Sequence, residues 1–169
     1  MAKILTSVVL GVALIATAGC TKKKPTTVLA PGDSPAANYD TTTGNTEDVS
    51  PLNEQFKREV TSDTVHFGLD QYDLDAESRS ILDSQVRWLL AHPNTRITIE
   101  GHCDERGTRE YNLALGDRRA NSAKNYLAAR GVSPTRITTV SYGKERPIAL
   151  GSDEQSWAAN RRAVTIVIN

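Results

Sequence analysis

After residue 60, hydrophobic and polar positions alternate in short segments, a pattern typical of β-strands buried on one face. The segment RITIE at 96–100 alternates clearly, and AVTIVI at 163–168 is apolar and rich in β-branched residues. The sequence therefore predicts strands at residues 64–67, 96–100, 137–141 and 163–168.

Between these strands, hydrophobic residues recur at intervals of three and four, as in a helix that packs one face on a core. One predicted helix follows Asp75, a suitable N-cap, and ends before Pro93. A second covers 110–130 and stops at Gly131. Its inward stripe consists mostly of small residues, which allow close approach to a sheet: Gly116, Ala120, Ala123 and Leu127.

Ser152 and Gln155 have the spacing of a capping box, which predicts a third, short helix carrying Trp157. Short strands separated by helices indicate an α/β sandwich in which helices cover at least one face of the sheet. About 110 residues are enough for one independent core.

The first 19 residues have the layout of a secretory signal, with Lys3, an apolar run over 4–18 and small residues before Cys20. The run is shorter than the roughly 20 residues of a spanning helix, so we expect a cleaved signal and not a transmembrane anchor. Ala18, Gly19 and Cys20 resemble a bacterial lipobox, with Thr17 where Leu is usual. This resemblance predicts cleavage before Cys20 and lipid on its thiol.

Composition changes after Cys20, because residues 21–51 hold four of the seven prolines and many Thr, Asn and Ser. Such a stretch cannot bury enough apolar surface to offset its ordering entropy. We expect a lipidated cysteine and flexible tether over 20–60, and one folded domain over 61–169. The lysines at 22–24 are either a solvated flank or a contact to anionic lipid headgroups.

Charge and cysteine content exclude two further classes. The chain has 169 residues with 20 Lys and Arg against 20 Asp and Glu, so its formal charge is zero, whereas nucleic-acid binding requires an excess of clustered basic residues. Its two cysteines, Cys20 and Cys103, form neither a disulfide framework nor a spaced zinc site. We therefore expect no nucleic acid, metal or other cofactor.

The loop GHCDERGT at 101–108 joins a predicted strand to the long helix, a common place for a ligand. Asp104 lies in this loop, and Arg119 lies on a helix face that it shares with Asn112 and Leu115. An acid and a guanidinium facing one cleft match a zwitterion, because each pairs with the opposite charge of the ligand. The alternative is that Asp104 only caps its loop and Arg119 pairs with a surface acid.

The string GHCDERGTREYNLALGDRRANSAKNYL at 101–127 closely resembles the signature of the OmpA-like peptidoglycan-binding domain. Three flanking segments agree, VHFGLDQYDL near 65–74, VSYGKERP at 140–147 and NRRAVTIVI at 160–168, so the resemblance covers about residues 60–169. It implies a two-layer α/β sandwich with a mixed four-stranded sheet and βαβαββ topology.

The resemblance also implies a ligand, the diaminopimelate of the peptidoglycan stem peptide. Asp104 matches the family's residue for the ligand ammonium, and Arg119 matches the residue for its carboxylate. Asp70 and Leu69 match further positions of the cleft, with Leu69 where Phe is usual. Cys103 stands where the family often has Ala or Thr, and we expect a buried or half-buried thiol.

Lipoproteins with this domain imply an anchor in the outer membrane, with the domain in the periplasm, and Thr21 agrees because the retention signal is usually Asp there. They also imply partners of the Tol system, notably TolB, and a role in envelope integrity and cell division. The alternative function is an envelope interaction module whose main partner is a TolB-like protein. The polar run NRR at 160–162 is either a solvated turn or a rim for peptide or protein contact.

An enzyme is the rival class, because four chemically active residues are consecutive: His102, Cys103, Asp104 and Glu105. Neighbours in an extended segment point in alternating directions, so these four cannot all converge on one substrate. His66 and His92 have no ligand spacing to His102. We therefore expect binding without catalysis.

Overall fold

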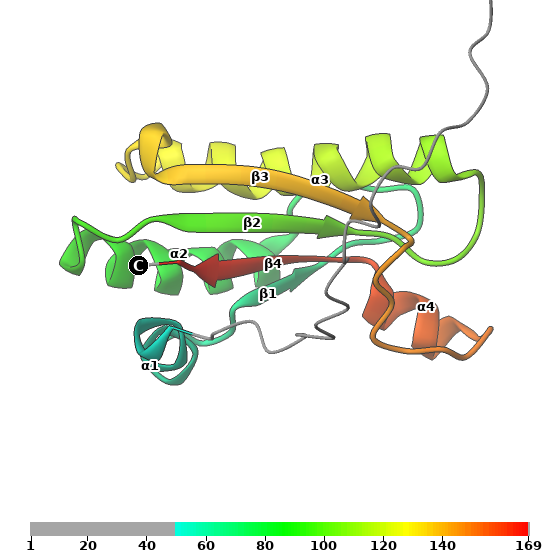
Figure 1. Ribbon diagram of the computed structural model, residues 1–169, viewed down its shortest axis with the longest axis horizontal. Coiled ribbons are helices and arrows are strands. Elements are labelled where there is room, and N and C mark those ends of the chain that lie inside the picture. The colour runs from blue at the N-terminus through cyan, green and yellow to red at the C-terminus, as the bar shows by residue number, and fades with distance from the viewer. Residues whose placement is uncertain (1–49, 169) are drawn as a thin grey trace, which may run out of the picture. The chain divides into compact units, whose positions relative to one another are not determined.

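The computed structural model describes residues 50–168, so the predicted signal at 1–19, Cys20 and the tether up to residue 49 lie outside the described residues. Helices and strands alternate along the chain (Figure 1). In order they are α1 (Pro51–Glu59), β1 (Thr64–His66), α2 (Ala76–Ala91), β2 (Ile97–His102), α3 (Arg109–Ala129), the 3-10 turn Pro134–Arg136, β3 (Ile137–Gly143), α4 (Glu154–Asn160) and β4 (Arg162–Val167).

The four strands form one mixed sheet in the order β1-β4-β2-β3. β2 and β3 are parallel, whereas β4 runs antiparallel to both of its neighbours, β1 and β2. In Figure 1, α2 and α3 lie together behind this sheet as the second layer. The predicted two-layer α/β sandwich with a mixed four-stranded sheet is confirmed.

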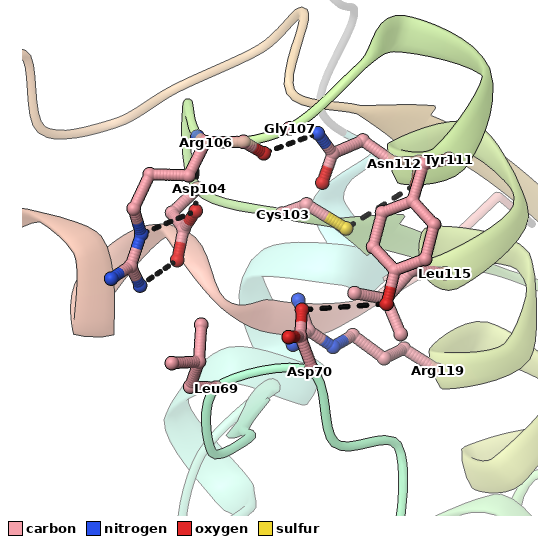
Figure 2. A pocket seen from close by; sticks show the side chains of 10 residues that line it. All are labelled: Leu69, Asp70, Cys103, Asp104, Arg106, Gly107, Tyr111, Asn112, Leu115 and Arg119. Atoms are coloured by element: carbon pink, nitrogen blue, oxygen red, sulfur yellow. Dashed lines mark hydrogen bonds and ion pairs between the residues drawn. The ribbon is translucent and has the colours of Figure 1, made fainter.

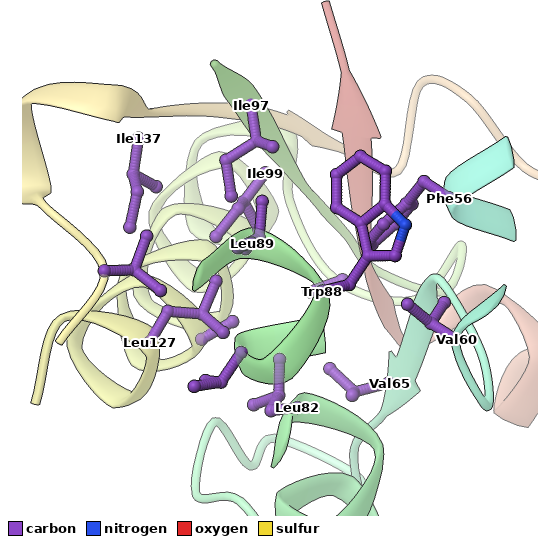
Figure 3. Packing of buried hydrophobic residues seen from close by; sticks show 14 of the residues in the cluster. Phe56, Val60, Val65, Leu82, Trp88, Leu89, Ile97, Ile99, Leu127 and Ile137 are labelled. Atoms are coloured by element: carbon purple, nitrogen blue, oxygen red, sulfur yellow. The ribbon is translucent and has the colours of Figure 1, made fainter. Parts of the chain in front are cut away.

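The core lies between the sheet and its helices (Figure 3). Alternate residues of β2, Ile97 and Ile99, are buried against it, as the alternating pattern predicted. Leu89 of α2 and Leu127 of α3 are fully buried in the same cluster. Each such side chain contributes about 1.5–3 kcal/mol through removal from water, which favours this arrangement of the layers.

The stripe of small residues on α3 brings the helix into direct backbone contact with β2. A Cβ atom on Gly101 would lie 1.8 Å from the carbonyl oxygen of Gly116, so both positions require glycine. This approach places the end of β2 and the loop after it directly beside the first turns of α3.

Helix α1 corrects the domain boundary that composition suggested. Composition predicts a tether up to residue 60, but Pro51–Glu59 form a helix capped by Ser50, and Phe56 is completely buried. Asn53 Oδ1 accepts a hydrogen bond of 2.8 Å from the backbone N–H of Val167, in the part of β4 that extends past its pairing with β1. The mostly polar sequence concealed this helix, because few of its residues are buried.

The helix caps agree with the sequence in one case and differ in another. Asp75 caps α2 as predicted, since its Oδ1 accepts a hydrogen bond of 2.7 Å from the backbone N–H of Ser78. Helix α4 begins one residue later than the capping-box spacing predicted, because Asp153 and not Ser152 accepts a hydrogen bond from the N–H of Ser156.

Among residues 50–168, no helix has the length and apolar content needed to cross a membrane.

Candidate functional site

A pocket of about 330 Å³ opens between the loop after β1, the loop after β2 and the first turns of α3 (Figure 2). All four predicted site residues of the domain line it: Leu69, Asp70, Asp104 and Arg119. The other lining residues are Cys103, Arg106, Gly107, Tyr111, Asn112 and Leu115. The fold thus brings together segments about 50 residues apart in the sequence, which periodicity alone could not show.

Asp70 and Leu69 form the wall that comes from the loop after β1. Asp70 has a φ of 55°, a left-handed conformation that is uncommon for a residue with a side chain. The hydroxyl of Tyr111 donates to Asp70 Oδ1 at 3.4 Å. Leu69 is 54% exposed, so it forms a rim and not a filled wall.

Asp104 lies in the opposite wall, and its side chain is only 7% exposed. Arg106 Nη2 donates to its Oδ2 at 2.6 Å, and Arg161 Nη1 donates to the same oxygen at 3.4 Å. Burial alone raises the pKa of Asp104, but hydrogen bonds and charge from Arg106, with help from Arg161, hold that pKa below its ordinary value. The carboxylate is therefore ionised and fixed in place.

Asp104 also accepts a hydrogen bond of 3.1 Å from the backbone N–H of Arg106, so it stabilises its own loop. The predicted loop-capping role is therefore present, and the same carboxylate also lines the pocket, so the predicted role toward a ligand stays a prediction.

Arg119 lies at the floor of the pocket with no exposed surface. Its guanidinium donates to three backbone carbonyls, those of Gln71 at 2.8 Å, His102 at 2.8 Å and Gly68 at 3.1 Å. Burial lowers its pKa, although the nearby acidic groups act in the opposite direction. Within residues 50–168 it forms no ion pair, so the interpretation that it pairs with a surface acid is wrong.

The turn that begins α3 holds the second wall in shape. The side-chain amide of Asn112 donates to the carbonyls of Arg106 at 2.7 Å and Thr108 at 3.0 Å. The thiol of Cys103 donates to the carbonyl of Asn112 at 3.3 Å, and burial raises its pKa. Cys103 is therefore a buried packing residue that faces the pocket, as expected.

Sequence reasoning missed three lining residues: Arg106, Gly107 and Tyr111. Their position in the sequence could have indicated them, because all three lie where the loop enters α3. The side chain of Thr108, the N-cap of this helix, accepts a hydrogen bond from the N–H of Tyr111.

The polar run at 160–162 also lies inside the fold. Asn160, Arg161 and Arg162 are all buried, which contradicts a solvated turn, and Arg161 reaches Asp104.

His102 takes no side-chain part in this pocket. Its ring stacks on Tyr142 with centroids 5.5 Å apart, and its Nε2 lies 3.3 Å from Glu100 Oε2. The consecutive residues 102–105 therefore diverge, as expected for an extended segment. Over the described part of the chain, no three His, Cys, Asp or Glu side chains are grouped to hold a metal ion.

The pocket thus combines a buried cation that has no carboxylate partner in the described part of the chain with two acidic side chains on opposite walls (Figure 2). Asp70 has no ion pair with another residue of 50–168, whereas the charge of Asp104 is balanced by two guanidiniums. Such a site suits a ligand that carries a carboxylate together with an ammonium group.

Comparison with known proteins agrees with this fold. Residues 66–161 match the OmpA family. A peptidoglycan-associated lipoprotein of Rhizobium meliloti is 52% identical over 105 residues, which span 62% of this chain and 60% of that protein. One from Agrobacterium fabrum is 40% identical over 153 residues, 90% of this chain and 82% of that protein.

A solved structure supports the same assignment. The crystal structure of the peptidoglycan-associated lipoprotein from Burkholderia pseudomallei has a TM-score of 0.62 and 43% identity, covering 63% of this chain and 91% of that one. The chain therefore belongs to the OmpA family and, within it, to the peptidoglycan-associated lipoproteins.

Proposed function

We propose that this chain is an outer-membrane lipoprotein whose folded domain, in the periplasm, binds peptidoglycan noncovalently through the diaminopimelate of the stem peptide. Lipid on Cys20 holds the chain in the membrane, and the segment between Cys20 and Ser50 lets the domain reach the cell wall. The names of these relatives, which associate them with peptidoglycan and with lipid, support this proposal.

One observation carries the proposed ligand chemistry, the buried guanidinium of Arg119 without a carboxylate partner in the described part of the chain. A buried charge without a partner is unfavourable, so a ligand carboxylate that reaches Arg119 gains a strong, charge-assisted contact. Asp104 and Asp70 then provide acidic groups for the ammonium at the other end of the same amino-acid head group.

The strength of such contacts fits a reversible link to the wall. Each charge-assisted hydrogen bond contributes about 1.5–3 kcal/mol net, so a few of them, less the ordering cost, give roughly micromolar affinity. Many copies bound to one polymer add avidity. The proposal requires no covalent step.

A pull-down with purified sacculi tests this function. The full chain in detergent is compared with Asp104→Asn, Arg119→Lys and the control Arg109→Gln, which removes a charge from an exposed ion pair with Glu145. We expect both pocket variants to lose retention at least tenfold and the control to behave as the wild type. Unchanged retention of both pocket variants would refute the assigned site.

The anchor has its own test. In Cys20→Ser, membrane fractionation should find the protein released into the soluble fraction, because the acylated thiol is missing. Tight membrane association of this variant would contradict the lipid anchor.

A second proposed activity is contact with a TolB-like protein of the Tol system. Ile148 and Leu150, in the segment between β3 and α4, are 65% and 87% exposed. Glu105, which follows Asp104, lines a small surface hollow with Leu150, so this apolar surface adjoins the pocket wall. Competition between a purified TolB-like protein and sacculi for the full chain will show whether the two surfaces overlap.

A further inference from the structure

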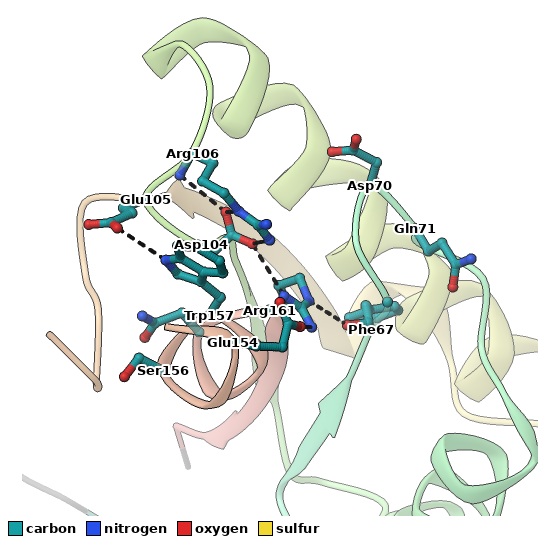
Figure 4. Close-up of polar contacts among 12 residues, drawn as sticks. Phe67, Asp70, Gln71, Asp104, Glu105, Arg106, Glu154, Ser156, Trp157 and Arg161 are labelled. Carbon is teal, nitrogen blue, oxygen red and sulfur yellow. Dashed lines mark hydrogen bonds and ion pairs between the residues drawn. The ribbon is translucent and has the colours of Figure 1, made fainter. Parts of the chain in front are cut away.

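Asp104 has no vacant acceptor site. An ionised carboxylate offers about four lone-pair positions, two on each oxygen. Oδ1 accepts from the backbone N–H and the Nε of Arg106, at 3.1 and 3.2 Å. Oδ2 accepts from Arg106 Nη2 at 2.6 Å and from Arg161 Nη1 at 3.4 Å. A ligand ammonium can therefore bond to Asp104 only if one of these donors leaves (Figure 4).

Two of the three donor groups are fixed. The backbone N–H of Arg106 belongs to the loop itself. Arg161 has a side chain only 7% exposed, and its other nitrogens donate to the carbonyl of Phe67 at 3.0 Å and to Glu154 Oε1 at 2.7 Å. The side chain of Arg106 is not fixed in this way. It is 34% exposed, and its guanidinium bonds to Asp104 itself.

Electrostatics identify the same group. An ammonium added beside Arg106 and Arg161 would place three cations around one carboxylate, and like charges at such separations repel. Exchange of one cation for another avoids this cost. The Arg106 guanidinium also lies 4.1 Å from the ring centroid of Trp157, whose indole N–H donates to Glu105 at 3.1 Å. The aromatic face therefore keeps a contact for the cation when it leaves Asp104.

We propose that Arg106 is an internal cation that competes with the ligand's ammonium for Asp104, and that it thereby sets the affinity and charge selectivity of the pocket. This inference rests on the proposed function. A ligand with both charges displaces Arg106 as it binds, whereas a ligand with only the carboxylate pairs with Arg119 and leaves Arg106 in place.

Two peptides separate these cases by calorimetry with the full chain. One is L-Ala-γ-D-Glu-meso-diaminopimelate, and the other carries 2-aminopimelate, which keeps the distal carboxylate but lacks the distal ammonium. In Arg106→Gln we expect the affinity for the first peptide to rise about tenfold, which corresponds to about 1.4 kcal/mol. The affinity for the second should stay within about twofold. Arg109→Gln, which removes the same charge outside the pocket, should change neither.

Other results overturn the proposal. Weaker binding of both peptides by Arg106→Gln would mean that Arg106 contacts the ligand itself. Unchanged binding of the first peptide would place the ammonium elsewhere, for example on Asp70, and would leave the proposed function intact. If the wild type binds neither peptide, the proposed function fails, and this inference fails with it.

A measurement on the unmodified protein removes any dependence on how Arg106→Gln folds. The indole N–H resonance of Trp157 should shift when the diaminopimelate peptide binds, because Arg106 changes its position over the ring. The aminopimelate peptide should leave it nearly unchanged. Equal shifts with both peptides, or none with either at saturation, would contradict the exchange.

Discussion

The rings of Phe56 and Trp88 pack edge to face, with their centroids 5.0 Å apart and their planes at 72°. This contact joins α1 to α2, and Trp88 Nε1 also donates to Glu59 at 2.8 Å. The relationship makes α1 part of the folded domain and not a piece of the tether.

Phe56→Ala should therefore lower the free energy of unfolding by about 3–5 kcal/mol, the usual effect of removing a buried aromatic ring. Urea unfolding measures the difference, and Lys57→Ala, on the exposed side of the same helix, should change it by less than about 0.5 kcal/mol. If Phe56→Ala leaves the midpoint of urea unfolding unchanged, α1 is not part of the folded domain.

Gly101→Ala should be among the most disruptive substitutions, because its Cβ would lie 1.8 Å from the carbonyl oxygen of Gly116. Neither backbone can move without separating α3 from the sheet, so we expect a loss of about 3 kcal/mol or more in thermal unfolding. Gly68→Ala is the matched control, since its nearest neighbours belong to the flexible side chain of Gln71. Equal effects of the two alanines would contradict the close approach of helix and strand.

The ion pairs of Asp104 predict a stability that depends on acid pH. Because the pKa of Asp104 is lower in the folded state, its contribution is present above its unfolded pKa, near pH 4, and is lost as the pH falls through the folded pKa. Asp104→Asn should be less stable than the wild type at pH 7, and the difference should shrink below about pH 4. Urea unfolding at several pH values gives the two curves, and a constant difference between them would rule out this role.

Arg119 should contribute to the fold as well as to the pocket. Lysine keeps the charge but lacks the planar fork that reaches the carbonyls of Gly68, Gln71 and His102 at once. We expect Arg119→Lys to lower the free energy of unfolding by about 1–3 kcal/mol, the cost of buried acceptors without partners. Arg118→Lys, one position along on an exposed side chain, is the control, and equal stability of both variants would show that these bonds matter little.

Regular periodicity made most of the fold predictable. The alternation in β2, the Asp75 cap of α2 and the end of α3 near Gly131, which has a φ of 100°, all follow from local rules and were confirmed. Helix α1 could not be found in this way. Its sequence is largely polar, and Phe56 is buried in a core most of whose other members, such as Trp88, are distant in the chain.

The candidate site, too, could be predicted from the sequence only in part. By itself, the sequence determined the strands and helices after residue 60, the loop that carries Asp104 and the residues that resemble a known signature, because these depend on neighbours in the chain. Only the tertiary structure decided that Asp70, Asp104 and Arg119 share one pocket, that Arg119 lies buried without a carboxylate partner among residues 50–168, and that Arg106 and Arg161 together fill the acceptor sites of Asp104. The physical reason is that burial and charge pairing depend on distances between side chains from separate elements, which are fixed only when helices and sheet pack together.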